Sequence, residues 1–577
     1  MIDVGRIGLL ADEALGSCND VLRYSHAYCY MPELATYREL WEKGLQGGGT
    51  GVPAEYPDWP AQGIALIGDF SGIQNFVLRP VPGAGGAARR LRSRSFRVSA
   101  YTEMIARWCL RELSSAQPHI LYSAGGKFLL QTNPFSGWKT RVRELQSRID
   151  AWAWRNFQGE LVFHLAAADF SSPKIPNSEL KHVLEKRRLE PMAAVLRPSQ
   201  WASSEFFQPA SASDRRCEAC GMTRPVQTNA EGEELCDGCL SDEDIGRKLA
   251  RARFVRLLES GGTTTGLAAL DFGMDLRESM GAADQSSWLA LETPVPGAEP
   301  WPLLRHVPSG PGGALDFDQI AQEAAGRKWL GYLRIDADHA GRSFAQLLGD
   351  PLRTWSLSRL LDRFFTVHTN DVLRTDFPSI YAVYGGGDDL FVIGPWDAVL
   401  DFAVRLRRDF AKITGNDLSF SAGISLAKPR EHILTQARRA HEELESAKAH
   451  PAYNRGCGRD QIRALGVTVD WETFDGLLQT AKRVARWVQS GDLPSSFLHQ
   501  MLELHHAWCR ARQHSDREGA ALVRYQPLLY YQIRRNLRGP AAEWAHSLLH
   551  TSSQWPWADF IVRYANLAGR QPSIEED

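Results

Sequence analysis

Two adjacent carboxylates follow a run of three glycines in the segment YGGGDDLFVIG. Gly385, Gly386 and Gly387 can adopt the positive φ angles of a tight hairpin turn, and the residues on both sides of the turn are apolar. The sequence therefore predicts a buried hairpin whose tip projects Asp388 and Asp389. Because neighbouring carboxylates repel each other, such a tip is typical of a site where a divalent cation lies between them and a further ligand.

A second pair of acids stands in LRIDADHAGRSF, where an apolar, strand-like run ends in Asp336 and Asp338. Alternation along a strand would place these two carboxylates on the same face. If this strand lies beside the hairpin, three or four carboxylates converge, which is the layout of a two-metal site for phosphoryl or nucleotidyl transfer. The alternative for GGDD alone is an exposed hairpin turn, in which Gly and Asp are common. The Asp-x-Asp strand end, about 50 residues upstream, favours the metal site.

An internal repeat accompanies the acids. The segments IGDFSGIQNFV and LRIDADHAGRSF each run from an apolar strand through Asp and a small-residue turn toward Phe. The segments HILYSAGGKFLL and SIYAVYGGGDDLFVIG each read as a strand, a Gly-rich turn and a strand. Aligning Tyr122 with Tyr384 gives an offset of 262 residues, and aligning Asp69 with Asp336 gives 267. Nearly equal offsets predict two copies of one domain, although strand–Gly–strand hairpins are common enough to agree by chance.

The first copy differs from the second at the acidic turn. Gly126 and Lys127 take the positions of Asp388 and Asp389, so this copy keeps the turn but lacks the acids. It is therefore not expected to hold two metals in the same way. One active and one inactive copy that face each other would suit the binding of two nucleotides, one of which is attacked.

Four of the nine cysteines form two close pairs. Cys217-x2-Cys220 and Cys236-x2-Cys239 are separated by 15 residues, which is the spacing of a tetrahedral zinc site. Four thiolates that leave no open coordination position predict a structural ion, around which this polar segment could fold. A pair of disulfides is the alternative, and a reducing compartment disfavours it.

Two weaker features concern phosphate binding. The run ARRLRSRSFRV makes Arg89, Arg90, Arg92 and Arg94 candidate contacts for RNA or triphosphate, and a helix with a solvated arginine face is the alternative. Lys448 ends a helical packing stripe and could meet a triphosphate, whereas an ordinary surface lysine is the alternative.

Length and composition limit the function classes. The chain has 577 residues, enough for about three to four domains. Lys and Arg total 66 against 68 Asp and Glu, and this net charge of −2 excludes a wholly basic nucleic-acid binder, though not a local basic groove. No apolar run approaches the ~18 residues of a membrane span, and the N-terminus has no signal-peptide pattern. The sequence therefore predicts a cytoplasmic protein with no membrane partner.

Taken together and in this order, the motifs resemble the large signature subunit of type III CRISPR–Cas effector complexes, a family with paired Palm domains. The resemblance covers about residues 60–540, and its carriers are GDFSGIQNFV, ARRLRSRSF, LYSAGGKFLL, the Cys pairs, DADHAG, YGGGDDLFVIGPWD, FSAGISLAKP and ELESAK. GDFSGIQ together with GGDDLF and GPWD is highly specific. The GPWD end looks like the III-A or III-D branch more than the III-B branch.

The resemblance implies an α+β multidomain fold. It comprises two ferredoxin-like Palm domains of the nucleotide cyclase or polymerase type, a four-cysteine zinc module and a C-terminal helical domain. We expect an N-terminal helical remnant and linker over 1–60, the first Palm domain without metal-binding acids over 61–205, the zinc module and a Pro- and Gly-rich linker over 206–315, the second Palm domain with GGDD over 316–465, and the helical domain over 466–577.

The activity that the resemblance implies is synthesis of cyclic oligoadenylates from ATP, joined 3′ to 5′ when the guide RNA of the complex pairs with target RNA. Two Mg²⁺ or Mn²⁺ ions on Asp336, Asp388 and Asp389 would support attack of one 3′-hydroxyl on another α-phosphate. By motif position, the nucleotide-binding candidates are Gly386, Gly387, Asp338, Ser71, Gly72 and Lys448. The implied partners are ATP, guide RNA, target RNA, and the backbone, small helical and guide-end-capping subunits.

One departure from the family concerns its nuclease. Many members begin with an HD nuclease domain, whereas this chain has no His-Asp dipeptide and only about 60 residues before the first Palm domain. We therefore expect no single-stranded DNase activity.

Two alternative functions remain open. A cyclase that makes a cyclic dinucleotide from GTP is one, because GGDD resembles the GGDEF turn, but the duplicated domain and the zinc module weigh against it. A non-catalytic scaffold for guide RNA and subunits is the other, and the intact acids weigh against it.

Overall fold

The computed structural model of the chain describes most residues from Trp59 onward. The described residues are Glu39, 59–79, 86–113, 119–196, 215–224, 226–229, 232–259, 262–263, 266–281, 287–291, 295–311, 313–347, 349–415, 417–451, 458–513, 524–550 and 554–569. The predicted N-terminal remnant over 1–60 lies almost entirely outside them.

The first domain is a four-stranded antiparallel sheet with helices against it. Its elements in chain order are β1 (Gly63–Ser71), α3 (Ile73–Val77), α4 (Ala87–Glu112), β2 (His119–Ala124), β3 (Lys127–Thr132), α5 (Trp138–Phe157), β4 (Val162–Phe170) and α6 (Asn177–Leu189). The strands lie in the order β2-β3-β1-β4. Strand β1 is buried along most of its length, because its apolar run is covered on both faces of the sheet.

The second domain repeats this arrangement and extends it. Its elements are β16 (Leu330–Ala337), α9 (Ala340–Gln346), α10 (Pro351–Arg363), the π-helical segment η2 (Phe364–His368), α11 (Thr369–Asp376), β17 (Tyr381–Gly386), β18 (Asp389–Pro395), α12 (Trp396–Thr414), β19 (Phe420–Ala427), α13 (Ile433–Ala449), β20 (Gln461–Ala464) and β21 (Val467–Asp470). The order β17-β18-β16-β19 corresponds strand for strand to that of the first domain, and β20 and β21 add a further edge.

The two domains also correspond residue by residue in the register of their paired strands. Asp69 on β1 lies opposite Lys127 on β3, and Asp336 on β16 lies opposite Asp389 on β18. The register of β2 with β3 shifts just before Tyr122, and that of β17 with β18 shifts just before Tyr384. Both offsets seen in the sequence, 262 and 267 residues, are therefore present in the paired strands, as expected for two copies of one domain.

Several short strands lie between the two domains in sequence. The cysteine segment forms β5 (Arg215–Arg216), β6 (Thr223–Arg224), β7 (Val226–Thr228) and β8 (Glu234–Cys236), followed by α7 (Asp237–Leu249). A five-stranded sheet follows, made of β9 (Phe254–Leu258), β10 (Ala268–Ala269), β11 (Phe272–Arg277), β12 (Ser287–Ala290) and β13 (Glu299–Pro300). The hairpin of β14 (Ser309–Gly310) and β15 (Gly313–Ala314) and the helix α8 (Phe317–Gln322) lead into the second domain. The stretch that we expected to be a linker therefore contributes β13, which pairs with β12.

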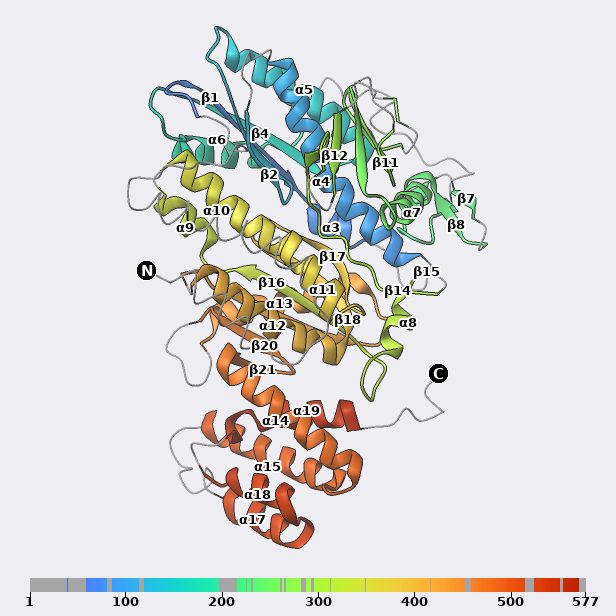
Figure 1. Cartoon of the computed structure of the whole chain (residues 1–577), viewed down its shortest axis with the longest axis vertical. Coiled ribbons are helices and arrows are strands. Elements are labelled where there is room, and N and C mark those ends of the chain that lie inside the picture. The colour runs from blue at the N-terminus through green and yellow to red at the C-terminus, as the bar shows by residue number, and fades with distance from the viewer. Residues whose placement is uncertain are drawn as a thin grey trace.

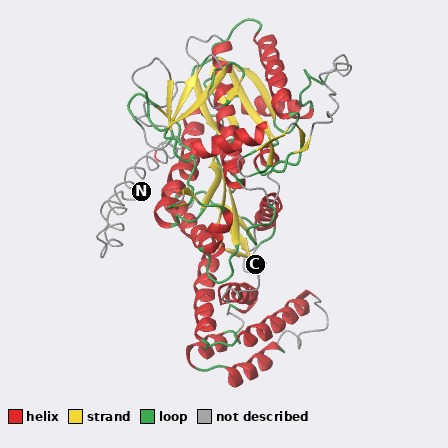
Figure 2. Cartoon of the chain, turned by 90° about the vertical axis from the view of Figure 1, so that its right-hand side faces the viewer, coloured by secondary structure: helices red, strands yellow, loops and turns green. Residues whose placement is uncertain are grey.

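The C-terminal part is helical, as expected. It consists of α14 (Trp471–Ser490), α15 (Ser495–Gln513), α17 (Tyr525–Asn536), α18 (Gly539–Ser547), a 3-10 turn η3 (Trp555–Trp557) and α19 (Ala558–Gly569). In Figure 1 the first domain lies at the top, the second in the middle and these helices at the bottom, and Figure 2 shows no strand among the lowest helices. Aromatic contacts join the last two parts, such as Trp396 with Tyr564 at 4.9 Å between ring centroids. In the part of the chain that the structure describes, no helix is both long and apolar enough to span a membrane.

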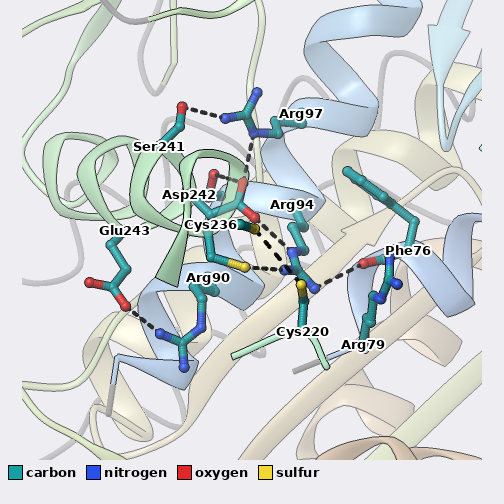
Figure 3. A network of polar contacts seen from close by, with 12 residues as sticks. Phe76, Arg79, Arg90, Arg94, Arg97, Cys220, Cys236, Ser241, Asp242 and Glu243 are labelled. Carbon is teal, nitrogen blue, oxygen red and sulfur yellow. Dashed lines mark hydrogen bonds and ion pairs between the residues drawn. The ribbon is translucent and has the colours of Figure 1, made fainter. Parts of the chain in front are cut away.

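A buried ionic network holds the cysteine segment to the first domain (Figure 3). Asp242 on α7 accepts hydrogen bonds from Arg94 Nε at 2.7 Å, Arg97 Nε at 2.8 Å and Ser93 Oγ at 3.0 Å, all on α4. Because the network is buried, each charge depends on its partners to offset the cost of leaving water.

Replacing Asp242 tests this network. We expect Asp242→Ala to lower the free energy of unfolding of this part of the protein by about 3–5 kcal/mol, because two arginines would be left buried without their acid. The matched control is Asp244→Ala on the same helix, where an exposed pair with Lys248 is lost and about 0.5 kcal/mol or less is expected. Thermal unfolding followed by circular dichroism measures both, and an equal effect of the two substitutions would contradict the assigned role of Asp242.

Candidate active site

Three acids gather where β16 ends and β18 begins. Asp336 and Asp389 are paired directly across these antiparallel strands, so their side chains are cross-strand neighbours. Asp388 is the exposed residue of the hairpin turn, and its backbone carbonyl accepts a hydrogen bond from the amide of Ala337 at 2.8 Å. The hairpin therefore lies beside the end of the Asp-x-Asp strand, as predicted.

Asp338 is near enough to Asp336 for its charge to raise the pKa of that carboxyl, but its own oxygens have other partners. It is buried, with 3% relative exposure, and its carboxylate accepts hydrogen bonds from Ser419 Oγ at 2.8 Å, Ser421 Oγ at 2.7 Å and the amide of Asp460 at 2.8 Å. Strand β16 ends at Ala337, so the alternation that we used to place Asp338 beside Asp336 has already stopped. Asp338 is engaged in holding β19 and the chain before β20, which does not support our expectation of a nucleotide contact.

Lys448 lies against the acids rather than on open surface. It is in the last turn of α13, and its Nζ donates to Asp336 Oδ2 at 2.5 Å and lies 3.5 Å from Glu445 Oε1. The ammonium therefore offsets part of the negative charge at this edge of the sheet. Any group that binds to the Asp336 carboxylate would therefore lie close to the Lys448 ammonium.

Burial and mutual repulsion hold two of the carboxyls toward their neutral forms. Burial is the main cause that raises the pKa of Asp389 to about 7, and the charge of Asp388 adds to the rise while Arg334 opposes it. Burial also raises the pKa of Asp336, which Lys448 counteracts. A divalent cation would remove this repulsion, and carboxylate oxygens are the ligands that Mg²⁺ and Mn²⁺ prefer. The donor set therefore fits such ions.

A cavity of about 180 Å³ lies beside the acids, between the two domains. Its wall includes Gly125 and Gly126 from the first glycine-rich turn, and Gly385, Gly386 and Asp389 from the second. Helices α3 and α4 close another side through Ile73, Gln74, Ser95 and Ser99. The two hairpins thus face one shared space.

Ser71 and Gly72 adjoin this cavity without lining it. The Ser71 hydroxyl lies 3.1 Å from His164 Nε2, and Gly72, with φ of 90°, is the N-cap residue that precedes α3. The residues that follow them, Ile73 and Gln74, reach the cavity wall. Of our candidates in the second hairpin, Gly386 lines the cavity, and Gly387 occupies the turn with φ of 63°.

The first domain has positively charged side chains at the equivalent edge of its sheet. Asp69 is buried, forms an ion pair with Arg188 and lies 3.8 Å from Lys127 Nζ. The acid that corresponds to Asp336 is therefore neutralised within the chain, and the partner that corresponds to Asp389 is a lysine. Our expectation that the first copy does not hold two metals in the same way stays a prediction, and these ion pairs are consistent with it.

Three of the four candidate arginines on α4 face the protein interior. Arg90 pairs with Glu243, Arg92 Nη1 donates to the carbonyl of Gly246 at 2.7 Å, and Arg94 pairs with Asp242. All three have 4% relative exposure or less, whereas Arg89 is half-buried. Our expectation that this run contacts RNA or triphosphate is therefore not supported for Arg90 and Arg94, whose charges are used against α7. Arg92 differs from them, because it also lines the cavity.

The four cysteines form one compact cluster. Cys217, Cys220, Cys236 and Cys239 are buried, and their sulfur atoms all lie within 4.8 Å of one another. Across the described ranges, this is the only group of three or more His, Cys, Asp or Glu side chains that close together. Arg94 Nη2 lies 3.5 Å from Cys239 Sγ and so links the cluster to α4. Four thiolates at this spacing fit a structural zinc ion.

Sequence reasoning missed Asp362. This buried acid on α10 accepts a hydrogen bond from the amide of Gly387 at 3.2 Å. It lies 25 residues before the turn it contacts, in a helix with no motif around it. No local pattern could have pointed to it.

Comparison with known proteins places both domains. Residues 329–457 match the family described as "Cas10/Cmr2, second palm domain", and residues 64–208 match "Csm1 subunit domain B". A protein of Mycobacterium tuberculosis is 28% identical over 440 residues, covering 67% of this chain and 52% of that protein. One of Thermococcus onnurineus is 24% identical over 477 residues, covering 72% and 58%. Both bear the name CRISPR system single-strand-specific deoxyribonuclease Cas10/Csm1 of subtype III-A.

Solved structures share the fold. A Csm1-Csm4 cassette in complex with cA3 has a TM-score of 0.67 at 19% identity, covering 91% of this chain and 72% of that chain. The apo cassette has a TM-score of 0.66 at 20% identity, with the same two coverages. The chain spans between 52% and 58% of the length of the two named relatives, whose names describe a deoxyribonuclease. Our expectation that this activity is lacking therefore stays a prediction.

The cysteine cluster predicts one bound zinc ion per chain. We expect Cys239→Ser to lower bound zinc to well below one equivalent, because a tetrahedral structural site needs all four ligands. Cys509→Ser serves as the control, since Cys509 is half-buried on α15 and lies outside the cluster. Metal analysis of the purified proteins measures both. A wild-type protein purified without zinc or a comparable ion would contradict the assignment.

The raised pKa of Asp389 predicts a stability difference that depends on pH. Between its ordinary value of 3.8 and about 7, the folded protein keeps a proton on Asp389 that the unfolded chain has lost. Ionisation therefore costs stability as pH rises through this window, and the cost is complete above pH 7. Asparagine cannot ionise, so we expect Asp389→Asn to raise the free energy of unfolding by about 2 kcal/mol at pH 8 and to change it little at pH 4.

Denaturant unfolding of zinc-loaded protein at the two pH values, without added Mg²⁺ or Mn²⁺, measures this difference. Asp417→Asn, at an exposed position of the same domain, is the control and should show no pH-dependent gain. A gain for Asp389→Asn that is the same at pH 4 and pH 8 would contradict the prediction.

Proposed function

The chain belongs to the Cas10/Csm1 family of large subunits of type III-A CRISPR complexes, and on that premise we propose that it joins ATP molecules into cyclic oligoadenylates. The observation that carries the proposal is the cross-strand pair of Asp336 and Asp389 at the wall of a cavity that both glycine-rich hairpins line. Related Csm1-Csm4 structures are described with ATP, cA3 and cA4, which supports this choice of nucleotide.

The three acids have distinct places in the proposed reaction. Asp336, Asp388 and Asp389 would hold two Mg²⁺ or Mn²⁺ ions, which supply activation of a 3′-hydroxyl and neutralise charge on the α-phosphate and the leaving pyrophosphate. Lys448, which contacts Asp336, would turn its ammonium toward the triphosphate. The raised pKa of Asp389 means that its ionised form is unfavourable without a cation, and a bound divalent cation would stabilise that form.

The first domain would hold the second nucleotide. Its turn residues Gly125 and Gly126 line the shared cavity, while its acid Asp69 is already paired with Arg188. This copy would therefore bind ATP without activating it, so that one nucleotide attacks the other. The β-α-β-β-α-β order of both domains supports their assignment as ferredoxin-like Palm domains.

The remaining partners follow from the family. We propose that the chain binds guide RNA and target RNA through its complex, together with the backbone, small helical and guide-end-capping subunits. The solved Csm1-Csm4 subcomplex of a type III-A interference complex supports a partner subunit for this chain. Target RNA would switch the synthesis on.

The test is mass spectrometry of the products made by the assembled complex. ATP and GTP are supplied separately with Mn²⁺, with and without target RNA. We expect cyclic oligoadenylates from ATP with target RNA only, and a loss of at least about a hundredfold for the double variant Asp388→Ala, Asp389→Ala, because the ions would lose two ligands. The control Asp417→Ala should retain full activity.

Two outcomes would overturn the proposal. Products from GTP alone would indicate a cyclic dinucleotide synthase. Unchanged ATP turnover in the double variant would show that these acids do not hold the catalytic ions.

A further inference from the structure

The glycines that precede Asp388 and Asp389 form a turn and also pack against a helix. Helix α10 passes into the π-helical segment η2, and this junction packs against β17. A Cβ at Gly385 would lie 2.7 Å from the carbonyl oxygen of Phe365, and one at Gly386 would lie 3.2 Å from Asp362 Oδ1. Gly385 needs glycine for space, because a side chain would displace the junction. Gly386 favours glycine because of its φ of 146°, and a Cβ there would also push on the Asp362 carboxylate. The π-helical segment η2 therefore packs closely against the backbone of β17, which precedes Asp388 and Asp389.

Asp362 provides the polar contact of this junction. Its Oδ1 accepts the hydrogen bond from the amide of Gly387, and its backbone carbonyl accepts one from Thr366 Oγ1 at 2.6 Å. The residue has 9% relative exposure, and burial raises its pKa while Arg359 and Arg363 oppose that rise. A buried acceptor aimed at one turn amide fixes that amide more tightly than solvent would.

The hairpin tip is thus held from two sides. On one side Asp362 holds the amide of Gly387, and on the other the amide of Ala337 in β16 holds the carbonyl of Asp388. These two bonds bracket the peptide that carries Asp388. The orientation of that peptide sets where the Asp388 carboxylate points, and Asp389 follows as the first residue of β18.

We infer that Asp362 is a positioning residue that holds the Gly387 amide and thereby sets the geometry of Asp388 and Asp389 for cation binding. The inference rests on the proposed function, because it assumes that these two acids bind divalent cations. A positioning role and a purely structural role predict different results. If Asp362 positions the acids, its replacement changes cation affinity in a protein that remains folded. Groups that orient metal ligands through hydrogen bonds commonly change metal affinity by about 10- to 100-fold when removed.

The test compares Asp362→Ala with Asp362→Asn in the full-length, zinc-loaded protein. The asparagine variant keeps an oxygen that can accept from Gly387, whereas the alanine variant does not. The matched controls are Asp397→Ala and Asp397→Asn, because Asp397 Oδ1 also accepts a backbone amide, that of Ala325 at 3.1 Å, beyond the opposite end of β18. Mn²⁺ binding is followed by electron paramagnetic resonance, and hydrogen exchange by mass spectrometry reports on the peptide from Tyr384 to Gly394.

We expect Asp362→Ala to weaken Mn²⁺ binding at least tenfold and to speed exchange in the hairpin peptide, while Asp362→Asn stays within about threefold of wild type. The Asp397 variants should leave Mn²⁺ affinity unchanged. Wild-type affinity in Asp362→Ala would overturn the inference, and so would an equal loss in both Asp362 variants, since that would indicate charge rather than the hydrogen bond.

A separate measurement distinguishes failure of the proposed function. If Asp389→Ala binds Mn²⁺ as wild type does, the acids are not the cation site and the proposed function fails. If Asp389→Ala loses Mn²⁺ and Asp362→Ala does not, only the positioning role fails. Thermal unfolding of each variant shows whether the protein is still folded at the temperature of the measurements.

Discussion

The repulsion between Asp336 and Asp389, held opposite each other on neighbouring strands, is the constraint around which the second domain is arranged. Antiparallel pairing brings the two side chains together whether or not a cation is present, and burial strengthens their repulsion. Lys448 offsets part of this charge from α13, and Arg334 offsets part of it from the same strand as Asp336. The energy needed to hold the acids in place comes from the apolar strands and helices beneath them, which are buried almost completely.

The first domain shows how the same fold behaves when this constraint is removed. At the equivalent positions it places Lys127 opposite Asp69, and Arg188 from α6 completes the neutralisation. The facing acids that repel each other in the second domain are therefore replaced there by an acid between two cationic side chains. The difference between an edge with paired acids and a self-neutralised edge therefore depends on very few side chains, since strand order and register are the same in both domains.

Local pattern was enough to predict some features and not others. The glycine hairpin, the acids at its tip, the repeat and the cysteine pairs could be predicted because each depends on residues close together in sequence or on a constant offset. The bonds of Asp338 to Ser419 and Ser421 could not be predicted, because these partners lie in β19 and just before it, about 80 residues further along the chain. The arginines of α4 were expected to bind phosphate, and only the fold shows that the distant helix α7 supplies Asp242 and Glu243 for them. Asp362 could not be predicted, because its partner is a backbone amide in a distant turn.

The ionic network of α4 connects the cysteine cluster to the cavity. Arg94 contacts Asp242 and Cys239 on one side, and its Nη1 lies 3.5 Å from the carbonyl of Phe76 in α3 on the other (Figure 3). Helix α3 lines the cavity through Ile73 and Gln74, so one guanidinium spans the distance between the cluster and the cavity wall. An arginine suits this position because its planar group offers several donors in fixed directions. A purely structural cluster can therefore still matter to the site. Through Arg94 it is connected to α3, which forms part of the cavity wall where nucleotides are proposed to bind.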